Sequence, residues 1–225
     1  MASKPYRFAG DQKVGRSILG RAEKRLVGRY VDRIPPGIET YHLTLMTLAW
    51  SGGVLLFGYL SSRWVGWIWG ISLMVALQYL TDLFDGAVGR HRGTGLIKWG
   101  FYMDHLLDFF FSGCLVIGYA LMAPEGMQFY FLGLLLCSGG FLVNSFLNFA
   151  CTNRFEIYYY GLGPTEVRLG YILINAVIFF WGVSIFRFWV PLFLAIHIIL
   201  LTVLAYQTHR RLWRMDMEQK TDPSD

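Results

Sequence analysis

The chain has 225 residues, a formal net charge of +5, 55% hydrophobic residues and 16% charged residues. A soluble domain of this size carries about 25% charged residues, so the composition excludes an ordinary water-soluble protein. The apolar residues also gather in long segments, which is typical of a chain whose main solvent is lipid. Residues 1–35 are basic and polar without an apolar run, and they predict no cleavable signal peptide.

A basic juxtamembrane segment covers residues 1–36. Apolar residues recur at helical spacing from Ile18 to Ile34, and most of the Arg and Lys residues lie off that stripe. Pro35-Pro36-Gly37 ends the pattern. We expect a cytoplasmic amphipathic helix here, lying on the anionic leaflet of the membrane. Packing of the same stripe on the base of the protein's own helix bundle is the alternative.

Six stretches are long and apolar enough to cross a membrane, which takes roughly 20 residues in a helix. Barrel strands would instead alternate polar and apolar residues over about ten positions. We therefore predict an all-α integral membrane protein with a six-helix transmembrane catalytic domain over residues 37–208 and a cytoplasmic tail over 209–225. The predicted spans are residues 41–60, 64–81, 99–122, 127–149, 167–186 and 188–207.

Basic residues indicate the orientation of these spans. With the N-terminus in the cytoplasm, 18 of the 20 Lys and Arg residues fall on the cytoplasmic side, and only Arg63 and Arg187 remain outside. Both chain ends are therefore expected in the cytoplasm, and the membrane is expected to be a bacterial inner membrane.

Four aspartates lie where the second predicted span ends and the third begins. Asp82 and Asp85 are three residues apart, and Asp104 and Asp108 are four apart, so each pair points to one side of its helix. Gly100 shares the stripe of the second pair, where a missing side chain leaves room for a ligand to approach the backbone. These positions predict a site that faces the cytoplasm.

So many carboxylates would repel one another unless cations are bound or some of the acids are protonated. Two divalent ions would balance four negative charges, and oxygen ligands suit Mg²⁺ or Mn²⁺. Metal pairs of this kind clamp phosphoryl oxygens, and Arg90, Arg92 and Lys98 are close enough in sequence to meet a diphosphate. Solvated helix ends without a function are the alternative, which suits the interfacial Asp82 best, because charges inside an apolar run are costly.

The spacing of these residues resembles the motif of the CDP-alcohol phosphotransferase (CDP-alcohol phosphatidyltransferase) family. That motif reads Asp, two residues, Asp-Gly, two residues, Ala-Arg, about eight residues, Gly, three residues, Asp, three residues, Asp. Gly89 stands where the family usually has Ala, and nine residues rather than seven or eight separate Arg90 from Gly100. Both departures concern the nucleotide-facing loop and not the metal ligands. Seven positions match the motif: Asp82, Asp85, Gly86, Arg90, Gly100, Asp104 and Asp108.

The resemblance implies a membrane enzyme of phospholipid synthesis. Such an enzyme transfers a phospho-alcohol group from a CDP-linked alcohol donor to an acceptor alcohol, releases CMP and uses two divalent ions, Mg²⁺ or Mn²⁺. The implied partners are the donor, a lipid or polar acceptor, membrane lipids and a second copy of the chain in a homodimer. No nucleic acid is expected as a partner.

The same resemblance assigns roles to the matching residues. The implied metal ligands are Asp82, Asp85, Asp104 and Asp108. Asp108 would bind the second ion and would also act as the general base on the acceptor hydroxyl. The residues implied to line the CDP moiety are Gly86, Arg90 and Gly100.

The donor and the acceptor are left open by the sequence. Asp104-His105-Leu106-Leu107-Asp108 and Gly163-Pro164-Thr165-Glu166 resemble stretches of the choline/ethanolamine phosphotransferases, whereas other members use CDP-diacylglycerol and a polar acceptor. Helix-entry chemistry explains the second stretch equally well, with Thr165 as the cap and Glu166 in the first turn.

Two further groups of residues have both a substrate-binding and a plainer interpretation. Tyr158–Tyr160 could stack on a quaternary ammonium, but an aromatic belt at the membrane interface is simpler. Arg154 and Arg168 could bind a phosphorylated acceptor, and Arg168, at the start of the fifth predicted span, could equally anchor a lipid headgroup.

A transporter or ion-translocating protein is the main alternative to an enzyme, because intramembrane carboxylates also mark ion paths. Transporters usually hold such residues near the membrane midplane on broken helices, whereas these lie toward one side. Other polar residues within the spans are expected to form interhelical hydrogen bonds, although the two asparagines of the fourth span could also line the site. These residues are Gln78, His105, Asn144, Asn148 and Asn175.

Overall fold

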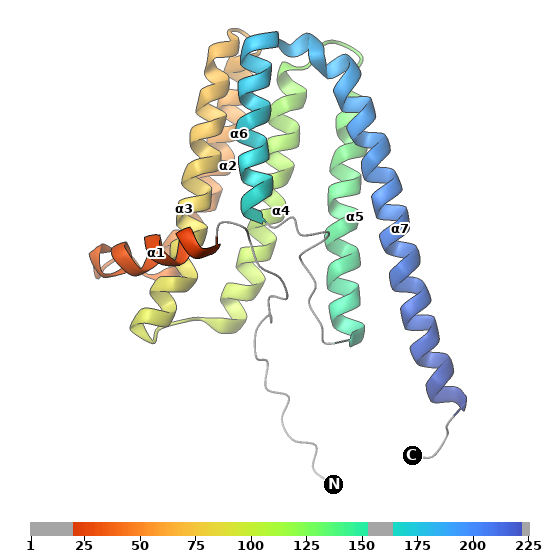
Figure 1. Cartoon of the computed structure of the whole chain (residues 1–225). Coiled ribbons are helices and arrows are strands. Elements are labelled where there is room, and N and C mark those ends of the chain that lie inside the picture. The colour runs from red at the N-terminus through yellow and green to blue at the C-terminus, as the bar shows by residue number, and fades with distance from the viewer. Residues whose placement is uncertain (1–19, 153–163, 222–225) are drawn as a thin grey trace.

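The computed structural model describes residues 20–152 and 164–221, and all regular elements there are helices. The described part begins with α1 (Gly20–Tyr30) and a short 3₁₀ turn (Val31–Arg33). Longer helices follow, which run up and down along one common direction (Figure 1). They are α2 Thr40–Ser61, α3 Ile68–Arg92, α4 Ile97–Met122, α5 Gln128–Thr152, α6 Pro164–Trp181 and α7 Phe186–Thr221.

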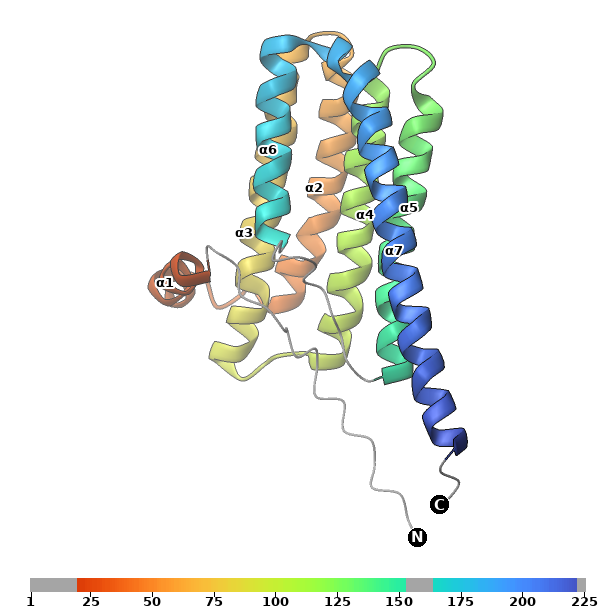
Figure 2. The same ribbon diagram turned by 45° about the vertical axis from the view of Figure 1, so that its right-hand side comes forward.

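Five segments of the described chain are long and apolar enough to cross a membrane. They are α2, α4, α5, and α3 and α7 together with the 3₁₀ turns Val65–Trp67 and Val183–Ile185 that lead into them. The protein is therefore an integral membrane protein, as its composition predicts. The remaining helix, α6, has 18 residues, and its first turns carry Glu166 and Arg168. It runs beside the others (Figure 2), and the count of six spans stays a prediction.

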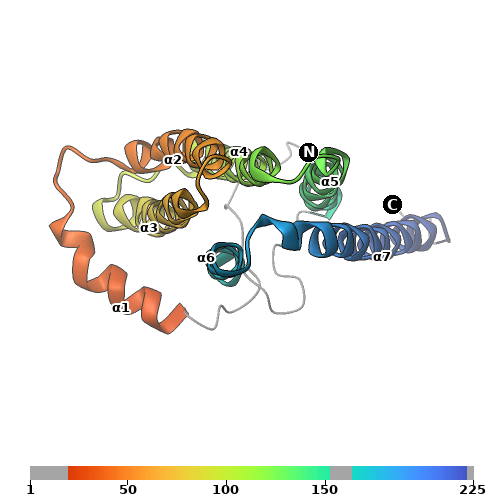
Figure 3. The same ribbon diagram turned by 90° about the horizontal axis from the view of Figure 1, so that it is seen from above.

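The helices form two groups, which Figure 3 shows end-on. In the first group α2 packs against α3 and α4, and α6 packs against α3; in the second, α5 pairs with α7. A Cβ added to Gly58 of α2 would lie 2.6 Å from the Cα of Gly118 of α4, so a glycine here lets the two backbones approach closely. The core of the first group includes the buried residues Val54, Ile71, Val75, Leu115 and Ile178.

A buried asparagine joins three helices of the first group. Asn175 of α6 is fully buried. It accepts a hydrogen bond of 2.7 Å from the Tyr119 hydroxyl of α4 and donates one of 2.9 Å to the Ser72 hydroxyl of α3. Because an unpaired buried amide would be costly, these partners explain how it is tolerated. The predicted interhelical bonding of Asn175 is confirmed.

The second group is joined by polar contacts as well. Asn144 of α5 donates to the Thr208 hydroxyl of α7 at 3.3 Å, and Arg211 of α7 donates to the side-chain Oδ1 of Asn148. Both asparagines therefore make the interhelical bonds that the sequence predicts. α7 continues to Thr221, so the segment predicted as a tail from residue 209 extends the last span as a helix through that residue.

α1 runs crosswise to the spans, beside the lower part of α3 (Figure 1). Val27 and Val31 pack with Leu43, Ala87 and Val88 of α2 and α3. This part of the apolar stripe therefore packs on the helix bundle of the protein itself, which was the alternative to a position on the membrane surface. The basic side chains of α1 are turned outward and exposed: Arg21, Lys24, Arg25 and Arg29.

The positions of the connections lead to a topology prediction. The α3–α4 connection and the end of α7 lie on the side of the bundle that carries α1, and the α2–α3, α4–α5 and α6–α7 connections lie on the other side (Figure 1). By the bias of basic residues, reporter fusions after residues 62, 125 and 187 should read external. Fusions after residue 92 and at the C-terminus should read cytoplasmic. An external C-terminus would contradict six spans.

Candidate functional site

Three of the four predicted metal ligands come together between α3 and α4. One carboxylate oxygen each of Asp82, Asp104 and Asp108 lies within 4.8 Å of the others, and the three residues are half-buried. Ligands on opposite sides of a Mg²⁺ ion are about 4.2 Å apart, because each Mg–O distance is about 2.1 Å. These three residues, called the acidic cluster below, therefore fit a divalent ion bound by oxygen.

The fold builds the acidic cluster from two helices that a short connection joins. Gly93 ends α3 in the left-handed conformation, with a φ of 68°, and residues 93–96 lead directly into α4. Asp104 and Asp108 lie on successive turns of α4, and both α3 and α4 pack on α2. α2 therefore supports both halves of the cluster.

Asp85, the fourth predicted ligand, does not join this group. Its Oδ2 accepts a hydrogen bond of 3.0 Å from the Thr44 hydroxyl of α2, and its Oδ1 accepts one from the backbone N–H of Gly86. The hydroxyl of Thr40 donates to the Asp85 backbone carbonyl at 3.0 Å. The structure thus directs Asp85 toward α2, one turn away from Asp82 on α3.

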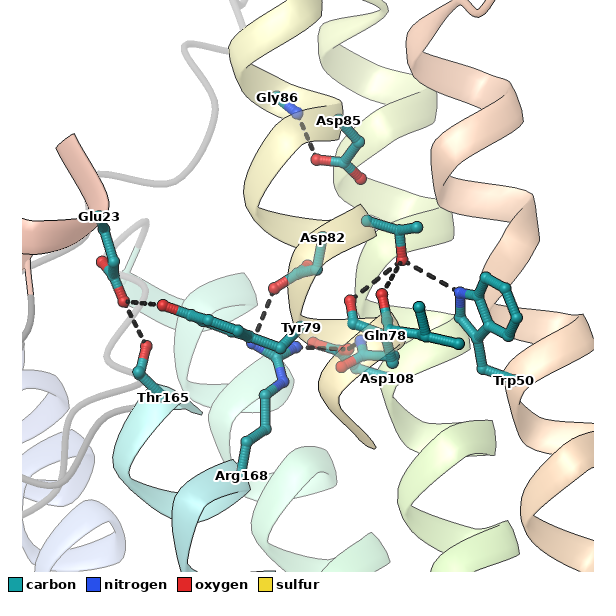
Figure 4. A network of polar contacts seen from close by, with 12 residues as sticks. Glu23, Trp50, Gln78, Tyr79, Asp82, Asp85, Gly86, Asp108, Thr165 and Arg168 are labelled. Atoms are coloured by element: carbon teal, nitrogen blue, oxygen red, sulfur yellow. Dashed lines mark hydrogen bonds and ion pairs between the residues drawn. The ribbon is translucent and has the colours of Figure 1, made fainter. Parts of the chain in front are cut away.

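Arg168 enters the acidic cluster from α6 (Figure 4). Its guanidinium pairs with Asp82 Oδ2 at 2.8 Å and lies 3.5 Å from Asp108 Oδ1, and its side chain is only 12% exposed. Three carboxylates and one guanidinium leave two negative charges when all are ionised. That is the charge which one divalent ion balances. From the sequence, Arg168 is expected only as a contact to a phosphate or to lipid headgroups, because its pairing with these aspartates depends on how α6 packs.

Gln78 is a second residue of the site that the sequence does not predict to lie there. It lies one turn before Asp82 on α3 and is 1% exposed. Its Nε2 donates to Asp108 Oδ1 at 3.1 Å, which is an interhelical bond as predicted. Its Oε1 is buried and has no hydrogen-bond partner among the described residues. A buried acceptor without a donor is unusual, and here it lies beside three carboxylates.

The predicted nucleotide contacts surround the end of α3 and the start of α4. Arg90 is exposed, and a Cβ added to Gly86 would meet only the flexible end of that arginine, at 3.0 Å. A Cβ added to Gly100 would meet no atom within 4 Å. Both glycines therefore border space that a ligand could use.

Arg92, predicted to meet a diphosphate, is bound to the chain itself. Its guanidinium donates to the carbonyl oxygens of Ile38 at 2.7 Å, of Ile34 at 2.8 Å and of Pro35 at 3.2 Å. These acceptors belong to the stretch that joins α1 to α2. Its role is therefore to hold this stretch, and Arg90 is the exposed arginine at the end of α3.

Local packing explains why a glycine occupies position 89, where the CDP-alcohol phosphotransferase motif usually has Ala. A Cβ on Gly89 would lie 2.8 Å from the Thr40 hydroxyl and 3.0 Å from the Cα of Gly95. The start of α2 and the α3–α4 connection thus pass too close for a methyl group. The Gly89 carbonyl also accepts a hydrogen bond of 3.1 Å from the Thr94 N–H, which closes the end of α3.

Two glycine variants test the packing role of Gly89 and the predicted ligand-binding role of Gly100 separately. Gly89→Ala should lower the stability of the protein, because overpacking typically costs about 1–3 kcal/mol. Gly100→Ala should leave stability unchanged or raise it, since alanine favours a helix by about 1 kcal/mol over glycine, yet it should weaken binding of a CDP-linked donor. Thermal unfolding and donor affinity, measured on both variants, check this. A destabilised Gly100→Ala would contradict the open space there.

Several residues offered as substrate contacts lie outside the described residues: Arg154, Tyr158–Tyr160 and Gly163. Thr165 is described, and it is not the cap of α6, because that helix begins at Pro164. Its hydroxyl instead donates to the carboxylate of Glu23 in α1 at 2.7 Å. Glu166 lies in the first turn of α6, as predicted.

Comparison with known proteins gives a partial relative but no matching family model. No protein-family model matches the chain. The chain is similar to "Inner membrane protein YnjF" of Escherichia coli (strain K12), with 36% identity over 97 residues. The matched region covers 43% of this chain and 43% of that protein, so the similarity spans less than half the length of either. Together with the five membrane-crossing segments, this similarity agrees with an integral membrane protein.

Proposed function

We propose that the chain is a membrane-bound CDP-alcohol phosphotransferase. It would transfer a phosphatidyl or phospho-aminoalcohol group from a CDP-alcohol donor to an acceptor alcohol and release CMP. The observation that carries the proposal is the convergence of Asp82, Asp104 and Asp108 from two helices, at the spacing of the family's motif. Carboxylates within membrane segments are costly, so a cluster of three favours a function over chance.

The chemistry of the cluster suits Mg²⁺ or Mn²⁺. Its donors are all oxygens, and the buried Oε1 of Gln78 lies on the same side chain that binds Asp108. The two negative charges that remain when Arg168 pairs with the three carboxylates suit one divalent ion. A bound diphosphate would bring the negative charge that a second ion requires. When bound, the ions would neutralise charge that develops on the diphosphate.

In the proposed step, the acceptor hydroxyl oxygen bonds to the phosphorus that carries the transferred alcohol. The bond from this phosphorus to the bridging oxygen of CMP breaks, and CMP leaves with that electron pair. Asp108 takes the hydroxyl proton, which requires only a carboxylate within hydrogen-bond reach. Gln78 and Arg168 both contact Asp108 Oδ1 and would orient the carboxyl group for this transfer.

The depth of the cluster favours an enzyme over a transporter. Asp104 is the eighth residue of α4, which puts its Cα about 10 Å along the axis at 1.5 Å per residue. A site near one end of the bundle suits a water-soluble nucleotide product. Because the partial relative is described as an inner membrane protein, we propose the inner membrane as the location, with the site facing the cytoplasm.

The test supplies purified protein in lipid–detergent micelles with Mg²⁺, one of several donors (CDP-diacylglycerol, CDP-choline or CDP-ethanolamine) and a panel of lipid and polar acceptor alcohols. We expect release of CMP with one donor class and a new lipid product in mass spectrometry. EDTA and Asp104→Asn should abolish both. Asp216→Asn, at an exposed position of α7, is the matched control and should retain turnover. No CMP from any combination would reject the proposal, and cation-driven uptake into proteoliposomes would favour a transporter.

A further inference from the structure

α1 carries one carboxylate among its eleven residues, and this side chain turns toward the bundle. Glu23 Oε1 accepts a hydrogen bond of 3.0 Å from the Tyr79 hydroxyl and one of 2.7 Å from the Thr165 hydroxyl. Tyr79 belongs to α3 and Thr165 to α6, so one carboxylate joins three helices (Figure 4). These three residues are called the Glu23 latch below.

The Glu23 latch borders the acidic cluster. The guanidinium carbon of Arg168 lies 5.8 Å from the centroid of the Tyr79 ring, where the face of the ring attracts a cation. The same guanidinium pairs with Asp82 and Asp108. The Tyr79 side chain thus contacts Glu23 by its hydroxyl and Arg168 by its ring. A continuous line of contacts leads from α1 to the cluster.

Among the described residues, few other contacts hold α1 in place. No residue of Gly20–Tyr30 is fully buried, and of its apolar side chains Val27 packs at the edge of the core. A segment with so little buried surface can leave the bundle without opening its core. Within the part of the chain that the structure describes, the two hydrogen bonds to Glu23 are therefore a large part of what holds this helix.

We propose that Glu23 is a positioning residue for the acidic cluster and that docking of α1 regulates the site. With the latch closed, the Tyr79 ring is fixed and keeps Arg168 on Asp82 and Asp108. With the latch open, Arg168 loses this support and moves away from the cluster. The cluster then binds a divalent cation more tightly, because a competing positive charge is farther away. The inference rests on the proposed function for its effect on turnover, but not for its effect on cation binding.

One double variant opens the latch without changing any charge. Tyr79→Phe with Thr165→Val removes both hydroxyls that donate to Glu23 and keeps the ring beneath Arg168. Mn²⁺ binding to the full-length protein, followed by the paramagnetic resonance of free Mn²⁺, should tighten by about two- to fivefold in this variant and by about tenfold in Arg168→Gln. No change in the double variant would overturn the inference.

The decisive comparison combines Tyr79→Phe and Thr165→Val, called the latch-opening pair below, with Arg168→Gln. If the latch acts through Arg168, the pair should then change the Mn²⁺ affinity by less than about 1.5-fold, because coupled residues are not additive. An equal shift with and without Arg168 would overturn the inference. Tyr59→Phe with Thr202→Val makes the same chemical changes at exposed positions of α2 and α7 and should leave the affinity unchanged.

Limited trypsin digestion measures docking of α1 separately. Cleavage at the exposed basic residues of α1 should be faster in the latch-opening pair than in the unchanged protein. The pair should speed cleavage by the same factor when it is combined with Arg168→Gln. Unchanged cleavage would overturn the inference. If the pair does not fold, Tyr79→Phe alone takes its place, with smaller shifts of the same sign. Neither measurement uses a CDP-alcohol, so failure of CMP release would sink the proposed function without deciding the role of Glu23.

Discussion

Asp108→Asn is expected to lower kcat by about 10²–10⁴-fold, the usual effect of losing a positioned general base. Asparagine keeps the size of the side chain and an oxygen that can accept from Gln78 and Arg168, both of which contact Oδ1 of Asp108. It loses the basic oxygen and one negative charge. Because proton removal matters in the transition state and little in the ground state, kcat should fall while the donor still binds.

Donor affinity and kcat, measured separately, decide the role of Asp108. Weakened donor binding with kcat restored at saturating donor would indicate a phosphate-binding role instead. Full activity of Asp108→Asn would mean that the acceptor proton leaves by another group, and His105 would be tested next. That residue contacts the Phe101 carbonyl oxygen of its own helix at 2.7 Å and the ring of Phe146 in α5, so we expect His105→Ala to have the smaller effect.

Cation binding is expected to divide the aspartates into two classes. Asp82→Asn and Asp104→Asn should each weaken Mn²⁺ binding by about a hundredfold or more, because each removes a charged oxygen from the acidic cluster. Asp85→Asn should weaken it by less than about tenfold, since its carboxylate is held by Thr44 and acts from outside the cluster. The family resemblance alone implies that all three aspartates are metal ligands, so that each substitution should weaken ion binding severely.

Calorimetric titration of the three variants with Mn²⁺, in the absence of any nucleotide, measures these losses. Asp32→Asn serves as the matched control, because Asp32 is an exposed carboxylate that pairs with His91 at 2.7 Å. An Asp85→Asn variant as weak as Asp104→Asn would show that the bound cation draws Asp85 away from α2. Undiminished binding in Asp82→Asn or Asp104→Asn would reject the cluster as a cation site.

Much of the helical architecture could be predicted, because the length of an apolar stretch decides whether it can cross the membrane as a helix. The spans predicted at 41–60, 99–122 and 127–149 agree closely with α2, α4 and α5. The ends of α3 and α7 could not be predicted in this way, because polar residues also form helices. α7 continues through Arg210, Arg211 and Arg214, which favour a helix nearly as well as leucine does.

The candidate site could be predicted only where it is local in sequence. Asp104 and Asp108 are one turn apart on any helix, so their common side follows from spacing alone. The partner of Asp85 is Thr44, 41 residues earlier, and Arg168 comes from a helix that begins far beyond α4. Such contacts depend on how helices pack, and no spacing rule within α3 predicts them.

Arg92 gives the juxtamembrane helix a mechanical property. By binding three carbonyl oxygens of residues 34–38, it pins the stretch that contains Pro35, Pro36 and Gly37. α1 can then tilt as one unit about this fixed stretch. The helix is about 16 Å long, because it has eleven residues at 1.5 Å each. Glu23 is the fourth residue of α1, far from this stretch, where a small rotation of the helix produces a large displacement. A slight tilt of α1 about this stretch is therefore enough to make or break the hydrogen bonds of Glu23 with Tyr79 and Thr165, without any bending of the helix.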